Sequence, residues 1–378
     1  MSYSLATIWY ERNRFLPAVL AVAFSALLIA LQSGLVLSLL AMMSLPVDKS
    51  AADFWVGFPG VRSVDLGRPI PYRWETRLLA QPEVEQVEPC LIGFAMWSPP
   101  PVGGSPSPPE ACTVVGTRLS PDALGVVEQL RRQPEVLARL AQPGAVVVDA
   151  TDFGRLGITG VGDTAEIMGN RVKVVGLTHG YKSLGGPYVF CSLETARPML
   201  HYFPDDVTYL LGRCRDPEQV PAVVARLRQR HGLEAFTSRE LSVRSQLHWL
   251  TTTKAGIALG FTALLGLLVG AVVTSQTLYA ATAASQREFA TLRAMGIPRW
   301  RLKFTVLEQS FWVGLLGILV AGPLAFLLAQ VAAWMGTPID LAPAILGAAA
   351  GITMAMALLS GLAALRSFQR VDPAQNIR

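Results

Sequence analysis

Long stretches without a charged side chain alternate with polar regions along this chain. Four such stretches occur, at Phe15–Val47, Ala255–Gln286, Gln309–Ile339 and Leu341–Leu365. A membrane-spanning helix needs about 20 predominantly apolar residues, and each stretch is long enough to provide them. The pattern therefore predicts four transmembrane α-helices.

The first stretch follows a basic start at Arg12 and Arg14, as the apolar region of a signal peptide would. Such an apolar region has only about 7–15 residues, however, and this stretch is about twice as long. We therefore expect an uncleaved anchor. The first three stretches are longer than a bilayer requires, so their helices either tilt or project beyond the membrane as helical stalks.

The polar region between the first two stretches, residues 47–249, has the pattern of a folded domain. Ala145–Asp149 predicts a buried strand. Gly169-Asn170 predicts a tight turn between two further strands, and Pro121–Leu140 predicts two short helices because a proline interrupts its helical spacing. Strand patterns that alternate with helical patterns indicate a large α+β domain. The Pro-rich segment Pro99–Pro109 predicts an exposed hairpin tip.

Composition and charge support a membrane protein. Of the 378 residues, 51% are hydrophobic and only 16% are charged, against roughly 25% charged residues in soluble domains. The net charge of +5 does not indicate nucleic-acid binding, because no Lys/Arg cluster is interleaved with aromatic residues. The basic residues near the apolar stretches instead serve as determinants of topology: Arg12, Arg14, Arg287, Arg293, Arg299, Arg301, Lys303, Arg366, Arg370 and Arg378.

The placement of these basic residues predicts the topology. With four crossings they all fall on one side, which the positive-inside rule identifies as the cytoplasm. Both termini are then cytoplasmic, and the large domain is extracytoplasmic. The expected divisions are 1–46 (N-terminus and helix 1), 47–249 (extracytoplasmic domain), 250–286 (helix 2), 287–303 (cytoplasmic coupling helix), 304–366 (helices 3 and 4) and 367–378 (cytoplasmic tail).

All four cysteines, Cys90, Cys112, Cys191 and Cys214, belong to the expected extracytoplasmic domain. An oxidising compartment permits disulfides, and four cysteines allow three pairings. We favour two local bridges, Cys90–Cys112 across the Pro-rich loop and Cys191–Cys214 between two candidate strands. Four buried free thiols are the alternative. A zinc site is not expected, because the sequence has no CxxC pair.

The sequence offers no catalytic residues and no metal site. It contains no GxxxxGK[ST], HExxH or GxSxG motif. The four histidines are scattered over the extracytoplasmic domain: His179, His201, His231 and His248. We therefore expect no enzyme activity and no cofactor in this chain.

A short charged segment, Ala284–Arg301, lies between the second and third apolar stretches. Phe289, Leu292 and Met295 form an apolar stripe along it. Gly296 and Pro298 then predict a helix end. Such an amphipathic helix either docks in a groove of a partner protein or lies on lipid, and its own pattern does not decide between the two.

Two motifs resemble those of MacB/FtsX-type ABC transporter permeases. Arg287–Gly296, REFATLRAMG, is similar to the RE-x-x-x-LRA-x-G coupling motif of that family. Arg370–Ala374, RVDPA, is similar to its RVDPAE ending, with Gln375 in place of the acidic residue. Glu308 matches a glutamate that the family often carries, and Gly160–Leu177 is similar to a glycine-rich strand pair. The layout of one helix, a large domain and three helices also matches, and the DevC-like subfamily is the most similar.

The resemblance implies a permease subunit of an export or efflux pump in the bacterial inner membrane, embedded in lipid. It implies a homodimer, or a heterodimer with a related permease. It also implies an ABC ATPase that binds ATP and Mg²⁺, a periplasmic adaptor of the membrane fusion type and an outer-membrane channel.

In such systems the ATPase moves the coupling segment, and helical stalks relay the motion to the outer domain. The residues implied to contact the ATPase are Arg287, Glu288, Phe289, Leu292, Arg293, Met295 and Gly296. An FtsX-like regulator that activates an extracytoplasmic hydrolase is the alternative function.

Overall fold

The computed structural model describes residues 10–100, 108–183, 185–284, 298–334, 339 and 341–368. The chain divides into two compact units. The apolar unit comprises Met1–Ser38 and Ile257–Arg378, and the outer unit comprises Leu39–Gly256. The outer unit extends beyond residues 47–249 at both ends, because the last turns of the first long helix and a helix before the second pack on the outer domain.

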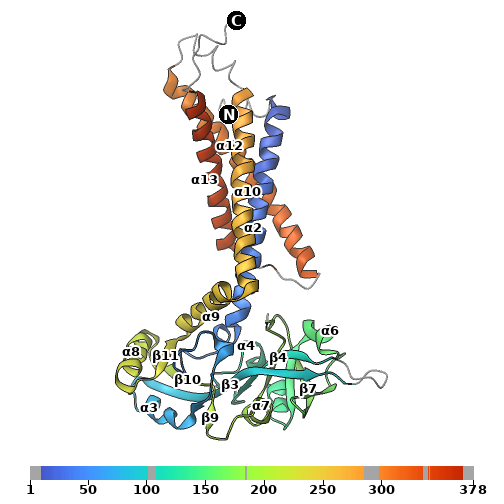
Figure 1. Ribbon diagram of the computed structural model, residues 1–378, viewed down its shortest axis with the longest axis vertical. Coiled ribbons are helices and arrows are strands. Elements are labelled where there is room, and N and C mark those ends of the chain that lie inside the picture. Colours follow the sequence, from blue (N-terminus) through green and yellow to red (C-terminus); the bar gives the residue numbers. More distant parts are fainter. Residues whose placement is uncertain are drawn as a thin grey trace. The chain divides into compact units, whose positions relative to one another are not determined.

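Four long helices carry the apolar stretches: α2 (Arg12–Asp48), α10 (Lys254–Ala284), α12 (Arg299–Trp334) and α13 (Pro343–Phe368). All four are long and apolar enough to cross a membrane. They confirm the four predicted helices, and a folded domain separates the first from the second (Figure 1). α12 begins before the third apolar stretch and so includes the charged residues Arg299, Arg301, Lys303 and Glu308.

Small residues bring the helices of the apolar unit close together. A Cβ atom at Gly270 of α10 would lie 3.3 Å from Cβ of Ser25 on α2. The Ser25 hydroxyl donates to the Gly270 carbonyl at 3.1 Å and accepts from the Thr274 hydroxyl at 3.0 Å. Gly317 of α12 packs against Val22 of α2. Close backbone approach and hydrogen bonds between helices replace the hydrophobic effect, which does not drive helix association within lipid.

The outer unit is built on a nine-stranded mixed sheet with the strand order β11-β1-β10-β3-β4-β8-β5-β7-β6. Its strands are β1 (Phe54–Gly57), β3 (Val84–Ser98), β4 (Glu110–Thr117), β5 (Ala145–Asp149), β6 (Thr164–Ile167), β7 (Asn170–Thr178), β8 (Tyr188–Ser192), β10 (Tyr209–Cys214) and β11 (Glu234–Thr237). A separate pair joins β2 (Ile70–Pro71) and β9 (Asp206–Val207). The last strand, β6, also pairs with β3, so the sheet closes at that end and β11 forms the edge at the other.

Helices cover both faces of this sheet. The first face packs against α3 (Glu75–Leu79), α7 (Leu193–Leu200) and α8 (Val220–His231). The second packs against α4 (Glu128–Arg131), α5 (Pro134–Leu140), α9 (Ser238–Thr252) and the end of α2. Shorter elements are α6 (Phe153–Leu156) and the 3₁₀ turns η1 (Val64–Leu66), η2 (Tyr72–Trp74), η3 (Ala150–Asp152) and η4 (Pro217–Gln219).

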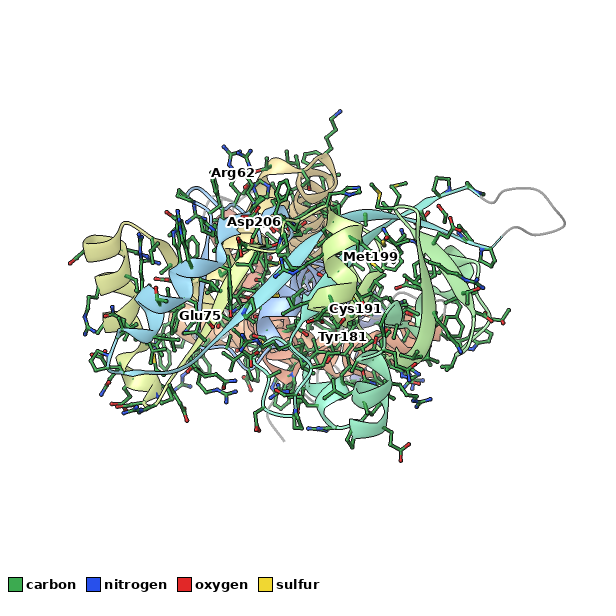
Figure 2. All side chains as sticks on the ribbon, turned by 90° about the horizontal axis from the view of Figure 1, so that it is seen from below. Arg62, Glu75, Tyr181, Cys191, Met199 and Asp206 are labelled. Atoms are coloured by element: carbon green, nitrogen blue, oxygen red, sulfur yellow. The ribbon has the colours of Figure 1, made fainter. Side chains whose placement is uncertain are left out.

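Strand alternation separates the two cores, because successive side chains of a strand point to opposite faces. Phe54 and Val56 of β1 lie in the first core, whereas Trp55 lies in the second. Cys191 of β8 and Met199 of α7, both labelled in Figure 2, belong to the first core. The architecture confirms the predicted α+β domain.

Local predictions differ in how well they hold. β5 has the predicted bounds, and Pro121–Leu140 contains α4 and α5, with Pro134 in the first turn of α5. The β6–β7 turn is formed by Met168 and Gly169, one residue earlier than predicted. Both have positive φ, 47° and 77°, as a two-residue hairpin turn requires. The Pro-rich segment joins the paired strands β3 and β4, and its residues 101–107 lie outside the described part.

The two favoured disulfides are not formed, and all four cysteines are buried free thiols. Cys112 pairs with Ala95, five residues beyond Cys90 on β3, which separates the two cysteines by roughly 17 Å. Cys191 and Cys214 lie on β8 and β10, with β3 and β4 between them. A disulfide requires Cα atoms within about 7 Å of each other. The sequence correctly placed Cys191 and Cys214 on strands, but the strand order separates them, and the pairing register separates Cys90 from Cys112.

Burial should protect these thiols from alkylation. It raises the pKa of Cys112 to about 12 and that of Cys214 to about 11, and it also raises the pKa of Cys90 and Cys191. Because the thiolate is the reactive form, the folded protein should resist iodoacetamide at neutral pH. Mass spectrometry should find four modified cysteines after unfolding without reductant. Fewer modified cysteines in that unfolded sample would show a disulfide and contradict the structure.

An ion pair between α8 and the loop before β3 should contribute to stability above acidic pH. Arg226 donates to the Glu83 carboxylate at 2.7 and 2.8 Å and lowers the pKa of Glu83 to about 2. The unfolded value is about 4.3, so the stabilisation is present above that pH and lost as the pH falls toward about 2. Glu83→Gln should therefore lower the unfolding temperature near neutral pH and flatten its decline in acid. The control Glu85→Gln, at an exposed neighbour, should change neither.

Candidate functional site

The predicted coupling segment lies outside the described residues, which end at Ala284 and resume at Pro298. This applies to Arg287, Glu288, Phe289, Leu292, Arg293, Met295 and Gly296, so their role stays a prediction. The next element, α12, begins at Arg299, within the range 287–303 expected for the coupling helix. Trp300 is exposed there, with the Arg301 guanidinium 5.3 Å from its ring centre. Glu308, on α12, is half-buried.

The outer unit contains a second candidate site, where the end of α2 and helix α9 meet the sheet. We call it the junction and define it as residues 42–48 of α2, 63–65 before and within η1, and 241–249 of α9. Leu45 and Val47 of α2 and Leu241 of α9 share one core with Trp55 and Tyr209 of the sheet. Tyr209 packs edge-on against Trp55, with ring centres 5.4 Å apart. Burying a large apolar side chain stabilises by about 1.5–3 kcal/mol, so this core anchors the end of α2 firmly.

Polar contacts join α2 directly to α9. The Gln246 side-chain amide donates to the Ser44 hydroxyl at 2.8 Å, and Ser44 donates to the Asp48 carboxylate at 2.6 Å. The Tyr188 hydroxyl of β8 donates to the Met42 carbonyl at 3.1 Å. The bonds from Gln246 and Tyr188 therefore link α2 to both a helix and a strand of the outer unit.

Further bonds fix α9 and the sheet to η1. The Val64 amide donates to the Ser245 hydroxyl at 3.0 Å, and the Trp249 indole donates to the Asp65 carboxylate at 3.3 Å. The Tyr209 hydroxyl donates to the Val64 carbonyl at 2.8 Å. The 3₁₀ turn therefore connects α9 with the centre of the sheet.

The chain passes from α9 to α10 at Thr253, whose backbone is extended (φ −88°, ψ 145°). Its hydroxyl donates to the Trp249 carbonyl at 2.6 Å and accepts from the Gly256 amide at 2.9 Å. One side chain thus bridges the last turn of α9 and the first turn of α10, which stiffens the break between these helices.

α2 is longer than a membrane-spanning helix needs to be. It runs for 37 residues without interruption, or about 55 Å, against a hydrocarbon core of about 30 Å. Its last turns belong to the core of the outer unit. The final residues of α2 therefore pack in a protein core.

No pattern in the sequence predicted the junction as a whole. One local signal was present: Thr237 and Glu240 have the spacing of a capping box, in which Thr237 accepts from the Glu240 amide at 3.1 Å and Glu240 accepts from the Thr237 amide at 3.0 Å. This signal marks the start of α9. The partners of Ser44 and Gln246 depend on tertiary contacts that no local pattern encodes.

Two protein-family comparisons cover most of the chain. The family described as MacB-like periplasmic core domain matches residues 15–230, and the family described as FtsX-like permease C-terminal matches residues 260–373. A curated relative, the macrolide export ATP-binding/permease protein MacB of Marinobacter nauticus, is 26% identical over 149 residues. That match covers 39% of this chain and 23% of the relative, so the chain spans less than a quarter of that protein.

Similar solved structures come from two extracytoplasmic domains. The periplasmic region of MacB from Actinobacillus actinomycetemcomitans is 12% identical, with a TM-score of 0.34, over 55% of this chain and 97% of that structure. The extracellular domain of the noncanonic ABC-type transporter YknZ from Gram-positive bacteria is 11% identical, with a TM-score of 0.31, over 49% of this chain and 98% of that structure.

A double-mutant cycle should measure the contact between α2 and α9. Ser44→Ala and Gln246→Ala should each lower the free energy of unfolding, and together by less than the sum, with a coupling energy of about 1 kcal/mol. Denaturant unfolding of the purified chain, followed by tryptophan fluorescence, provides the measurement. Ser44→Ala with Arg171→Ala, on the distant strand β7, is the matched control and should be additive. Additivity in the first pair would mean that the two side chains are not coupled.

Proposed function

Because the chain belongs to the MacB/FtsX family of ABC transporter permeases, we propose that it is the permease subunit of an ATP-driven export or efflux transporter. In this proposal it carries out no chemistry and transmits force across the bacterial inner membrane. ATP and Mg²⁺ are bound by a separate ABC ATPase, in keeping with the lack of a GxxxxGK[ST] motif in this sequence.

One observation carries the proposal: α2 is a continuous helix whose far end is built into the outer core. A helix that slid out of that core would expose Leu45 and Val47 and break the Ser44–Gln246 contact. Sliding would cost several kcal/mol, because burial of each large apolar side chain stabilises the core by about 1.5–3 kcal/mol. A displacement of α2 therefore carries the sheet with it, because sliding of α2 out of the outer core is unfavourable.

The force enters at Arg287–Gly296 in this proposal. The basic residues beside the apolar stretches support a cytoplasmic location for this segment and for both termini. The FtsX-like family match includes the segment. Its apolar stripe of Phe289, Leu292 and Met295 docks in a groove of the ATPase, and Glu288 and Arg293 flank that stripe. Closure of the ATPase pair then moves the segments of two permease copies together.

The outer unit delivers the motion to a periplasmic partner. We propose a homodimer of this chain together with an adaptor of the membrane fusion type and an outer-membrane channel, as in DevC-like systems. The relative named as a macrolide exporter supports an export role. The cargo is handled outside the membrane, so the membrane helices need no polar conduit.

Substitutions in the coupling segment test this function. Glu288→Ala and Arg293→Ala should leave the complex with the ATPase intact in co-purification but lower substrate-stimulated ATP hydrolysis and export by about tenfold or more, because charged contacts at an interface fix the register of the two partners. The matched control Glu135→Ala with Arg139→Ala, at exposed positions of α5, should change neither activity. Normal export in the coupling variants would refute the coupling role. Co-purification of a cell-wall hydrolase in place of an adaptor would support the regulatory alternative.

A further inference from the structure

A groove follows the open edge of the outer sheet. It has a volume of about 960 Å³ and lies beside β11, between the end of α8 and one face of α9. Its lining includes Leu233, Glu234, Phe236 and Thr237 of the strand region, Arg228 of α8, and Arg239, Glu240, Val243, Arg244 and Leu247 of α9. Because β6 pairs with β3 at the other end of the sheet order, β11 is the strand that ends the sheet without a second neighbour among the described strands.

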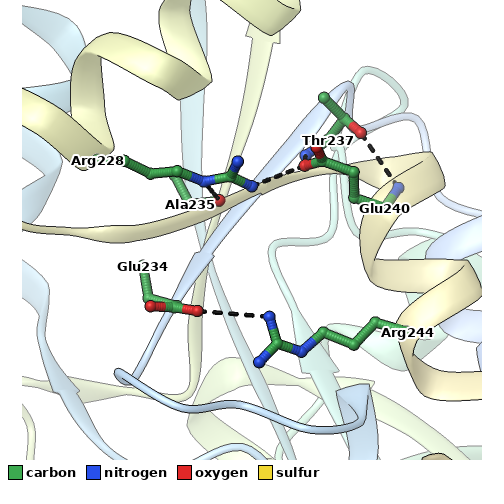
Figure 3. A network of polar contacts seen from close by, with 6 residues as sticks. All are labelled: Arg228, Glu234, Ala235, Thr237, Glu240 and Arg244. Atoms are coloured by element: carbon green, nitrogen blue, oxygen red, sulfur yellow. Dashed lines mark hydrogen bonds and ion pairs between the residues drawn. The ribbon is translucent and has the colours of Figure 1, made fainter.

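Side chains form hydrogen bonds with the backbone groups along this edge. The residues of β11 alternate, and Phe236 pairs with Trp55 of β1. On the side away from β1, the Ala235 carbonyl accepts from Nε of Arg228 at 2.6 Å. The Thr237 amide donates to Oε2 of Glu240 at 3.0 Å. Figure 3 shows both contacts, which take the places that a neighbouring strand would fill.

The groove is rich in arginine. Arg228 pairs with Glu240 at 2.7 Å and Arg244 pairs with Glu234 at 3.5 Å, as Figure 3 shows. Both guanidinium groups also lie over the Phe236 ring, 5.6 and 4.9 Å from its centre. With exposed Arg239, the lining has three arginines and two glutamates, so it favours an acidic ligand.

Two apolar side chains border the same groove. Val243 and Leu247 are one turn apart on α9 and are 54% and 56% exposed. An apolar pair beside arginines and a strand edge is the combination that strand-adding peptide sites use, with main-chain bonds for affinity and side-chain pockets for specificity.

We propose that this groove binds an extended peptide segment with acidic and apolar side chains, which adds to the edge of β11. The incoming backbone amide takes the Ala235 carbonyl from Arg228, and the incoming carbonyl takes the Thr237 amide from Glu240. The released arginine pairs with a carboxylate of the peptide, and apolar side chains cover Val243 and Leu247. The inference goes beyond the proposed function, since it concerns the outer unit alone and holds whether or not an ATPase drives the chain.

Peptide binding to the detergent-solubilised full chain tests the inference. The probe is a short fluorescein-labelled peptide of alternating Glu and Val, and its affinity is measured by fluorescence anisotropy. A peptide with Lys in place of Glu tests the charge. A third peptide, N-methylated at alternate residues on the edge that faces β11, keeps the side chains but cannot form the strand bonds. The structure predicts that only the first peptide binds.

Variants of the groove complete the test. Arg239→Ala with Arg244→Ala should weaken binding of the Glu–Val peptide by about tenfold or more, whereas Arg171→Ala on β7 should not change it. Val243→Glu keeps the arginines and adds a like charge at an exposed position, so it should weaken binding without affecting the fold. Equal binding of the N-methylated peptide would overturn strand addition. Equal binding to the wild type and to both groove variants would overturn the site.

Discussion

The anchoring of one long helix in the core of the outer unit is the interaction on which the rest of this structure depends. Leu45 and Val47 are residues of α2, and they are also core residues beneath the sheet. The helix therefore cannot shift along its axis without opening that core. The bonds from Ser44 to Gln246 and from Tyr188 to Met42 hold the same turns from two further directions. These contacts join the last turns of α2 to the sheet and to α9.

α10, the second long helix, is also held by short-range contacts. α10 packs on α2 through Ser25, Gly270 and Thr274, where small side chains allow close approach and hydrogen bonds join the helices. Outside the apolar unit, Thr253 bridges α9 and α10 with one hydroxyl. Short-range contacts therefore stiffen the packing of α10 on α2 within the apolar unit and the passage from α9 to α10. In the proposed function, the chain carries out no chemistry, and the stiffness of these contacts allows it to transmit force.

The features that depend on local pattern could be predicted, and those that depend on register or tertiary contact could not. Uncharged stretches identified the four helices, and the run of valines identified β5. The β6–β7 turn was predicted one residue too late, because Met168 adopts a positive φ, which is unusual for methionine. The disulfides failed because the register of β3 and β4 places Cys90 and Cys112 far apart. The junction and the groove were missed, since Gln246 finds Ser44 only after the domain has folded.

Uncoupling the helices from the outer unit tests the central claim most directly. A flexible Gly-Ser insertion between Leu39 and Leu40 of α2, together with one at Thr253, would leave both units folded and remove the continuous path between them. Export and ATP hydrolysis should then be measured on the same complex in proteoliposomes. We predict that the protein with both insertions continues to hydrolyse ATP but no longer exports its substrate. A protein with either insertion alone should not export at the wild-type rate. Export at the wild-type rate through both insertions would contradict transmission of force through these helices.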